Sequence, residues 1–228
     1  GYVGAFPYAE VISGFTSFYL GVKSVCDSAT MEVKYTNSWA SFDLEKECAE
    51  QLIADGCVLI SQHADTTGAP TACEAKKVPC VGYNIDMIPT APDAALTSAT
   101  INWGPYYTYA VQSVIEGTAI DTDWSKGVKD GADAITELND KTVAKGTKEK
   151  VEEAQKGIED GTIHVFDTSK FTVGGKTLEE LVESGDEDAT KLQSYIKDGY
   201  FHESDVAGGM TSAPAFTFII DGIDSITK

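Results

Sequence analysis

Short apolar runs alternate with helical patterns through the first hundred residues, and this alternation most constrains the fold. Helices are expected at 8–23, 44–54 and 69–77, between the apolar runs. The run at 57–61 is continuously apolar, which is typical of a strand buried on both faces of a parallel sheet. The alternation predicts right-handed βαβ units, and therefore an α/β fold with a doubly wound, mostly parallel sheet flanked by helices. The expected strands are 2–6, 31–36, 57–61, 79–83 and 95–101.

Local signals indicate where several of these helices begin and end. Asp43 is the expected N-cap of the helix 44–54, and Gly56 suits the left-handed conformation that ends it. A further helix at 106–116 has Pro105 at its start and Gly117 at its end.

The later part of the chain differs in composition and pattern. Polar residues dominate 118–148, and a charged helix is expected over 148–158. A short strand is expected at 163–166 and a helix at 177–184. The tail, 213–226, carries the apolar run Ala-Phe-Thr-Phe-Ile-Ile.

The charge balance excludes some classes of partner. The 228 residues include 36 acids against 17 bases, for a net charge of −19. Such a charge repels phosphate backbones and anionic lipids, so we expect no nucleic-acid partner. The chain has no apolar run of about 18 residues, so we expect no direct membrane insertion by this segment.

Signatures of enzymes and metal sites are absent from the sequence. There is no G-x-S-x-G, no P-loop and no H-E-x-x-H, and the two glycines of the opening GYVGAF are not spaced as in a dinucleotide fingerprint. The five cysteines form no C-x-x-C pair, and there are only three histidines. We therefore expect no catalytic residue, no metal and no cofactor.

Aromatic and polar side chains follow the expected strands, where ligands of doubly wound sheets bind. Flat rings can stack on a planar ligand, and carboxylates accept hydrogen bonds from its N–H or O–H groups. A few polar groups in an aromatic cleft are typical of a small-molecule site. The candidate ligand-binding residues are Phe6, Trp39, His63, Asp65, Asp86 and Trp103.

Each candidate also has a purely structural interpretation. Trp39 and Trp103 are compatible with core aromatics, and His63 with a hydrogen-bonded structural histidine. Asp65 precedes a helix and could serve only as its N-cap, while Asp86 lies before Pro89, where turn-forming aspartates are common. Their joint placement at strand ends is what favours a binding site.

Five stretches occur in an order that resembles a known family. They are 37–39 (NSW), 62–65 (QHAD), 82–87 (GYNIDM), 102–107 (NWGPYY) and 158–161 (IEDG), the last leading into 165–166. Any one of them is a weak signal, but the ordered set extends over nearly the whole chain. It resembles the basic-membrane-protein (BMP) family of substrate-binding lipoproteins that serve ABC importers.

The resemblance implies a type I periplasmic-binding fold, with two α/β lobes of flavodoxin-like strand order joined by a hinge. Its implied ligand is a purine nucleoside or base, and its implied partner is the permease of an ABC importer. Trp39 would line or stack on the ligand, with His63 and Asp65 at the pocket floor. Asp86 matches the second acid of the family's strand-end motif, and Trp103 would lie near the hinge.

The same resemblance implies how the chain is divided. Gly1 to Gly4 resemble the strand that begins the family's second lobe, so most of the first lobe is expected to precede this chain. Residues 1–104 would form the second lobe, and 105–140 would cross toward the first lobe. Residues 141–228 would form a C-terminal helix, a short strand and a tail on the lobe and hinge. The full-length protein would be an extracellular, membrane-anchored lipoprotein.

Two other kinds of function compete with the binding module. One is a hydrolase-like enzyme on a flavodoxin-like fold that uses His63 and Asp65, and the other is a non-catalytic sensor domain. The aromatic strand ends favour the binding module, and the lack of a nucleophile motif disfavours the enzyme. If the helices that carry Cys48 and Cys73 share a face of the sheet, a disulfide between the two is a further hypothesis.

Overall fold

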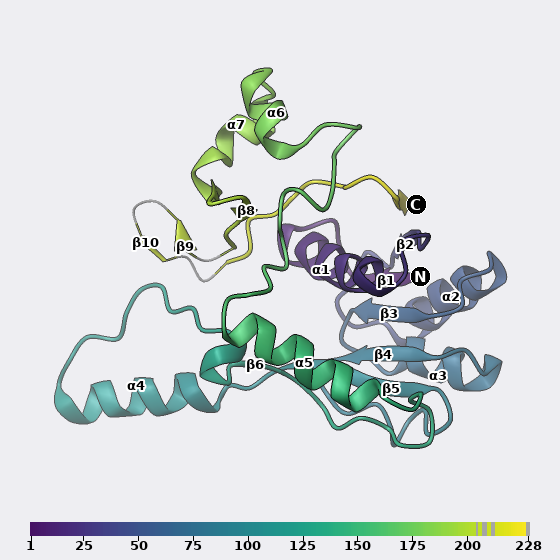
Figure 1. Ribbon diagram of the computed structural model, residues 1–228. Coiled ribbons are helices and arrows are strands. Elements are labelled where there is room, and N and C mark those ends of the chain that lie inside the picture. Colours follow the sequence, from purple (N-terminus) through teal and green to yellow (C-terminus); the bar gives the residue numbers. More distant parts are fainter. Residues whose placement is uncertain (204, 207–208, 211–212, 227–228) are drawn as a thin grey trace.

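The computed structural model describes residues 1–203, 205–206, 209–210 and 213–226. Its centre is a seven-stranded sheet with the order β11-β2-β1-β3-β4-β5-β6 (Figure 1). All neighbouring pairs are parallel except β5 and β6, which are antiparallel. The strands are β1 (Tyr2–Gly4), β2 (Met31–Tyr35), β3 (Ile60–His63), β4 (Cys80–Tyr83), β5 (Ala95–Ile101), β6 (Asp133–Ile135) and β11 (Ile223–Ile226).

The first five strands confirm the sequence-based fold class. Their order, β2-β1-β3-β4-β5, is the predicted flavodoxin-like order of a doubly wound sheet. Three helices connect β1 to β4, each crossing from one parallel strand to the next. They are α1 (Ala9–Val25), α2 (Phe42–Ala54) and α3 (Gly68–Lys76).

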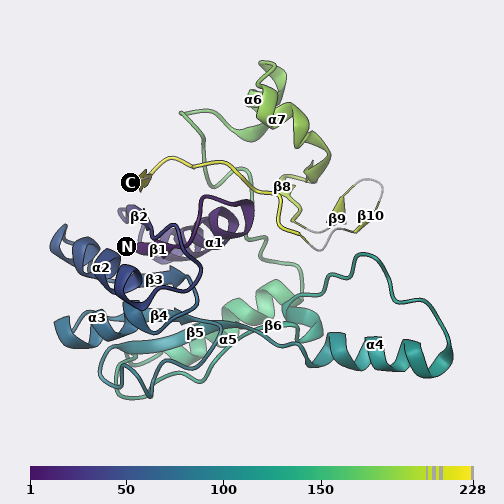
Figure 2. The same cartoon turned by 180° about the vertical axis from the view of Figure 1, so that it is seen from behind.

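The two faces of the sheet bury separate apolar cores. Successive side chains of a strand point to opposite faces, so Tyr2 packs with Phe15 of α1 while Val3 packs with Leu52 of α2. Figure 1 shows α1 and α5 (Thr147–Glu159) in front of the sheet, and Figure 2 shows α2 and α3 covering its other side. The sheet is therefore covered on both faces, as its apolar strands require.

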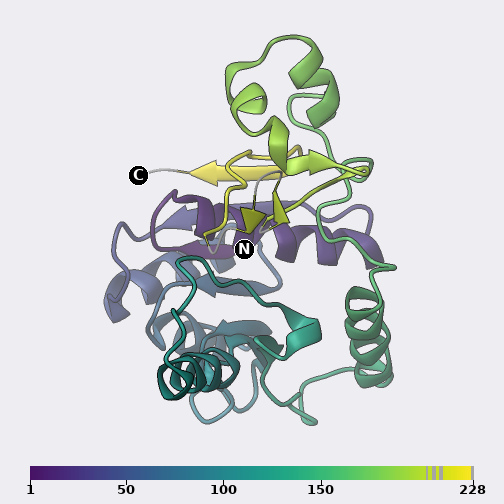
Figure 3. The same ribbon diagram turned by 90° about the vertical axis from the view of Figure 1, so that its left-hand side faces the viewer.

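Helix α4 (Gly104–Glu116) stands apart from this layered body. It projects away from the sheet in Figures 1 and 2 and is seen nearly end on in Figure 3. Ser113 is its only buried residue. Its exposed side chains nevertheless include Tyr107, Val111, Val114 and Ile115. An apolar helix surface of this kind is unusual for a helix in contact with water.

The C-terminal part packs back on the α1 side of the sheet. It contains α6 (Leu178–Glu183), α7 (Glu187–Lys191), two short antiparallel pairs and an aromatic core. Phe216 is fully buried at the centre of that core, and it contacts the rings of Phe166, Phe171, Phe201 and Phe218. The short strands are β7 (Ile196–Lys197), β8 (Tyr200–Phe201), β9 (Asp205–Val206) and β10 (Gly209–Met210).

Three local predictions were wrong. The strand expected at 57–61 begins at Ile60, because Cys57 still donates its N–H to Leu52 O of α2, and Val58 is 81% exposed. The N-cap of α2 is Ser41, so Asp43 is its second helical residue, where an acid still faces the positive end of the helix dipole. No strand forms at 163–166, where residues 165–166 are part of a turn.

The disulfide hypothesis was also wrong. All five cysteines lie in the described part of the chain, and none of them forms a disulfide, Cys48 and Cys73 included. Cys73 forms a hydrogen bond with Cys80 instead, and that bond together with burial raises the pKa of the Cys73 thiol. The helices α2 and α3 do pack on the same face, as the hypothesis assumed, but the two thiols are not joined.

Candidate ligand-binding site at the strand ends

The ends of β1, β2, β3 and β4 bring aromatic rings into one cluster. The centroid of Trp39 lies 5.5 Å from that of Phe6 and 6.4 Å from that of His63. The His63 ring lies 4.3 Å from Tyr83, and Tyr8 stacks on Phe6 at 5.1 Å. We call Phe6, Tyr8, Trp39, His63 and Tyr83 the strand-end cluster.

The parallel register explains why these side chains meet. Gly4 is paired with both Tyr35 and His63, so β1, β2 and β3 end at the same level. The strand-end loops are then joined to each other, since the Asp65 N–H donates to Trp39 O at 2.8 Å. Asn37, with a φ of 54°, turns the chain between β2 and Trp39 in the left-handed region that asparagine tolerates.

His63 is the most buried polar group of the cluster, at 8% exposure. Burial lowers its pKa to about 4, so its imidazole is neutral at pH 7. Glu10 Oε1 of α1 lies 3.8 Å from His63 Nε2, and with a neutral imidazole this contact is not a full ion pair. A neutral imidazole offers one N–H donor and one acceptor nitrogen to a ligand.

A glycine in α1 makes room for this imidazole. A Cβ atom added at Gly14 would lie 2.7 Å from His63 Nδ1, closer than real side chains approach each other. The helix can therefore lie against the strand end only because this residue has no side chain.

Tyr83 supplies a phenol beside the imidazole. Burial and the nearby carboxylates of Glu10 and Asp65 raise its pKa to about 12, so the hydroxyl keeps its proton at neutral pH. Asp65 is exposed at the margin of the cluster. The strand ends thus combine ring faces, a neutral imidazole, a phenol and carboxylates.

The other two predicted residues lie differently. Asp86 is exposed, and its Oδ1 accepts a hydrogen bond from the Ile88 N–H at 2.9 Å, as in an Asx turn. Trp103 does not join the strand-end cluster but lies 6.2 Å from Tyr107 and 6.4 Å from Tyr106, with 54% of its surface exposed. Its group continues through Tyr109 to Trp124.

Sequence reasoning missed three members of the site: Tyr8, Glu10 and Tyr83. Tyr83 is the last residue of β4 and lies within the stretch GYNIDM, so its position at a strand end was an available signal. Tyr8 and Glu10 lie at the start of α1, immediately after the Phe6-Pro7 turn. Ligands of such sheets often bind where a helix begins directly after a strand, and this rule could have pointed to both residues.

The arrangement suits recognition of a flat, hydrogen-bonding molecule. Rings provide stacking surfaces, and donors and acceptors surround them. Within the described ranges, no three His, Cys, Asp or Glu side chains gather as they would to hold a metal ion. In those same ranges, no helix is long and apolar enough to cross a membrane.

The fold is shared with proteins of known structure. An ABC transporter solute-binding protein from Conexibacter woesei shares it, with a TM-score of 0.57 and 19% sequence identity over 72% of this chain and 55% of that protein. At that identity the likeness concerns the fold alone.

The sequence places the chain more narrowly. Residues 1–167 match the Bmp family, the PnrA-like substrate-binding proteins of ABC transporters, and the chain belongs to this family. The resemblance seen in the sequence is thereby confirmed.

Two curated relatives differ in the ligand that their names give. A purine-binding protein of Brucella abortus is 32% identical over 166 residues, which are 73% of this chain and 47% of the relative. A candidate ABC transporter glucose-binding protein of Haloferax volcanii is 30% identical over 172 residues, 75% of this chain and 44% of the relative. The chain spans about half the length of these relatives.

Proposed function

We propose that this chain is the ligand-binding part of an extracellular solute-binding component of an ABC importer, and that it captures a purine nucleoside or base without chemical change. The observation that carries the proposal is the strand-end cluster, in which the neutral imidazole of His63 lies between the rings of Trp39 and Tyr83, and Phe6 contacts Trp39. Membership of the Bmp family supports the transport role.

The chemistry of the cluster favours a purine over a sugar such as glucose. Trp39 and Phe6 offer flat surfaces, which stack on a heterocycle more completely than on a puckered ring. A neutral His63 can donate to one ring nitrogen or accept from an N–H, and Asp65 can accept from an amino or hydroxyl group. The name of the Brucella abortus relative supports the same ligand class.

The proposed ligand set keeps all six residues predicted from the sequence, in two groups. Phe6, Trp39, His63 and Asp65 act together at the strand ends. Asp86 and Trp103 contribute from the following loops, Trp103 as part of the hinge. Asp86 would exchange its turn hydrogen bond for one from the ligand.

A second lobe accounts for the apolar surface of α4. We infer that residues 1–104 form the body of one lobe, that the chain crosses toward the other lobe within 105–140 and rejoins this sheet at β6, and that 141–228 pack on the lobe and the hinge. Tyr107, Val111, Val114 and Ile115 are exposed in this chain, and a facing lobe would bury them. The full-length protein would be a membrane-anchored lipoprotein that delivers its ligand to a permease.

Calorimetry tests the proposal on this chain and on the full-length protein. Adenosine, guanosine, adenine, guanine and glucose are titrated in turn. Trp39→Ala and Asp65→Asn are expected to weaken purine binding by about tenfold or more, since each removes a stacking or hydrogen-bonding partner. Glu152→Gln, an exposed acid on α5, is the control and leaves affinity unchanged.

Three outcomes would contradict the proposal. The full-length protein would bind glucose but no purine, or the Trp39 and Asp65 variants would bind purines as well as the control does. Chromatography that detects a free base after incubation with a nucleoside would show catalysis, and would favour the enzyme that uses His63 and Asp65.

A further inference from the structure

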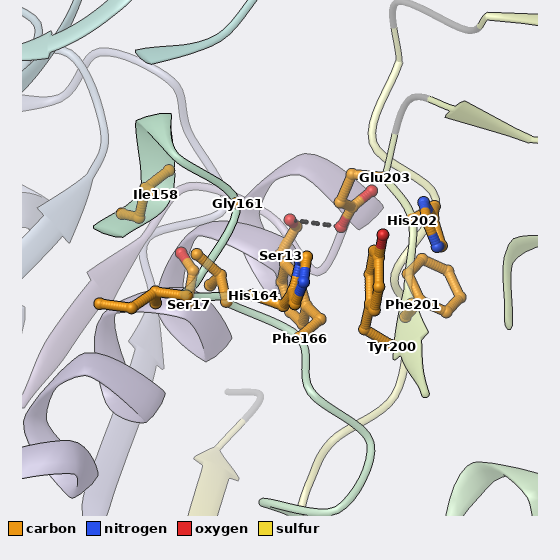
Figure 4. A pocket seen from close by; sticks show the side chains of 12 residues that line it. Ser13, Ser17, Ile158, Gly161, His164, Phe166, Tyr200, Phe201, His202 and Glu203 are labelled. Atoms are coloured by element: carbon orange, nitrogen blue, oxygen red, sulfur yellow. Dashed lines mark hydrogen bonds between the residues drawn. The ribbon is translucent and has the colours of Figure 1, made fainter. Parts of the chain in front are cut away.

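A cavity of about 440 Å³, lined by no residue of the strand-end cluster, lies between α1, the end of α5 with its following loop, and the C-terminal segment (Figure 4). None of the six predicted ligand residues lines it. The family match ends at residue 167, so the wall formed by 200–203 lies beyond the matched region.

Three rings form one wall of this cavity as a continuous stack. Tyr200 lies between His164 and His202, with centroid distances of 3.8 Å and 3.9 Å and interplanar angles of 10° and 28°. The outer rings have one face each that the stack leaves free. Ile158, Ile163 and Val165 add apolar surface at the rim.

A carboxylate from the C-terminal segment contributes the charge of the cavity. Glu203 Oε1 accepts a hydrogen bond from Ser13 Oγ at 2.6 Å, as Figure 4 shows, and Oε2 accepts one from the Ala215 N–H at 2.7 Å. Both donors are neutral. The Phe216 N–H is a third neutral donor to the same carboxylate. The two oxygens together offer about four acceptor positions, so the carboxylate can accept a further hydrogen bond.

The electrostatic surroundings of Glu203 favour a cation as its partner. Among the described residues that line the cavity, none is Lys or Arg. Burial raises the pKa of the Glu203 carboxyl, which is the cost of holding a charge away from water. The whole chain carries a net charge of −19, which attracts cations further.

We propose that this cavity is a second binding site, which takes a small organic cation with a protonated amine on a ring or a short apolar body. The ammonium donates to Glu203, and the apolar body lies between the outer face of His164 and the aliphatic rim. Nothing in this inference depends on the strand-end cluster, and the two sites can be tested separately.

Three probes of similar size and different charge test the proposal by calorimetry or ligand-observed NMR. They are 2-phenylethylamine, which is a cation at pH 7, neutral 2-phenylethanol and anionic 3-phenylpropionate. The amine is expected to bind at one site about tenfold more tightly than the alcohol, because it forms a charge-assisted hydrogen bond with Glu203. The anion is expected not to bind.

Two variants test whether the amine binds in this cavity. Glu203→Gln is expected to lower the affinity for the amine to that of the alcohol, while Glu152→Gln on α5 leaves it unchanged. Ser17→Phe fills the cavity from α1 without removing Glu203, since the Ser17 hydroxyl donates to Gly14 O of its own helix. It is expected to abolish amine binding and to leave purine binding at the strand ends intact.

The proposal is overturned if the three probes bind with equal affinity, or if the amine binds the Ser17→Phe variant as tightly as the parent. If Glu203→Gln fails to fold, the Ser17→Phe variant still tests whether the amine binds in this cavity. Loss of purine binding with intact amine binding would contradict the proposed function and not this second site.

Discussion

The buried imidazole of His63 connects the candidate site to the stability of the protein. Its pKa is about 4 in the folded chain against an ordinary value of 6.5, so between these pH values the unfolded chain binds a proton that the folded chain does not. Stability from this group is fully present above pH 6.5 and is lost as the pH falls toward 4. We expect a loss on the order of 3 kcal/mol.

Urea unfolding of the parent and of His63→Gln, at several pH values from 4 to 7, measures this effect. Glu45 and Glu203, whose pKa values burial raises, act in the opposite direction in both proteins. The difference between the two unfolding free energies therefore isolates the imidazole. Curves that remain parallel across this pH range would refute the assignment.

The thiols should differ in reactivity according to their burial. Cys26 is exposed, whereas Cys48, Cys73 and Cys80 are buried, and the raised pKa of Cys73 further lowers its thiolate fraction. Iodoacetamide is expected to modify Cys26 first in the native protein, and all five cysteines in urea. Peptide mass spectrometry that finds Cys73 modified as quickly as Cys26, or joined to Cys48, would contradict the structure.

At the scale of elements, α2 and α3 pack closely because Gly68 begins the second of them. A Cβ atom at Gly68 would lie 2.2 Å from Phe42 O, a backbone atom that cannot move aside easily. Glu45 of α2 links the starts of both helices. Its carboxylate accepts hydrogen bonds from the N–H groups of Thr66, before α3, and of Ser41, before α2. The contact therefore depends on the smallest residue at its centre.

Gly68→Ala is expected to destabilise the protein by about 1–3 kcal/mol through overpacking. Gly21→Ala is its matched control, because Gly21 also lies in a helix but has no atom within 4 Å of the added Cβ. That control is expected to stabilise by about 0.5–1 kcal/mol, as alanine does in helices. Chemical denaturation of both variants measures the change in unfolding free energy. Equal changes in the two variants would contradict the close packing at Gly68.

At the scale of the whole molecule, the C-terminal segment is part of the core of the sheet. Phe216 and Ile220 are buried against α1, and β11 pairs in parallel with β2. Phe216→Ala is expected to lower the unfolding free energy by about 3–5 kcal/mol, since it leaves a cavity among four other rings. Phe42→Ala, at a ring 43% exposed, is the control and should cost much less. Similar losses in both variants would mean that the aromatic core does not stabilise the fold.

The features of the fold that could be predicted from the sequence are those that local patterns determine. The alternation of strands and crossing helices followed from local patterns, whereas the order of β1 to β5 was implied by the resemblance to the BMP family. Residues after β1, β2 and β3 meet because these parallel strands end at the same level. Trp103 was harder to place, because it follows the last of these strands and turns with α4 toward its own aromatic neighbours. The pairing of β11 with β2 joins residues far apart in the sequence, and no local pattern carries that information.

The same pairing has a consequence for the time course of folding. β2 is synthesised early, but the strand that covers its outer edge is β11, which is made after every other strand of the sheet. Until then the edge has free N–H and C=O groups that another growing chain can pair with. A contact between such distant segments also forms slowly. The yield of soluble protein in a cell therefore depends on how long that edge stays open, and hence on the speed of translation and on chaperones.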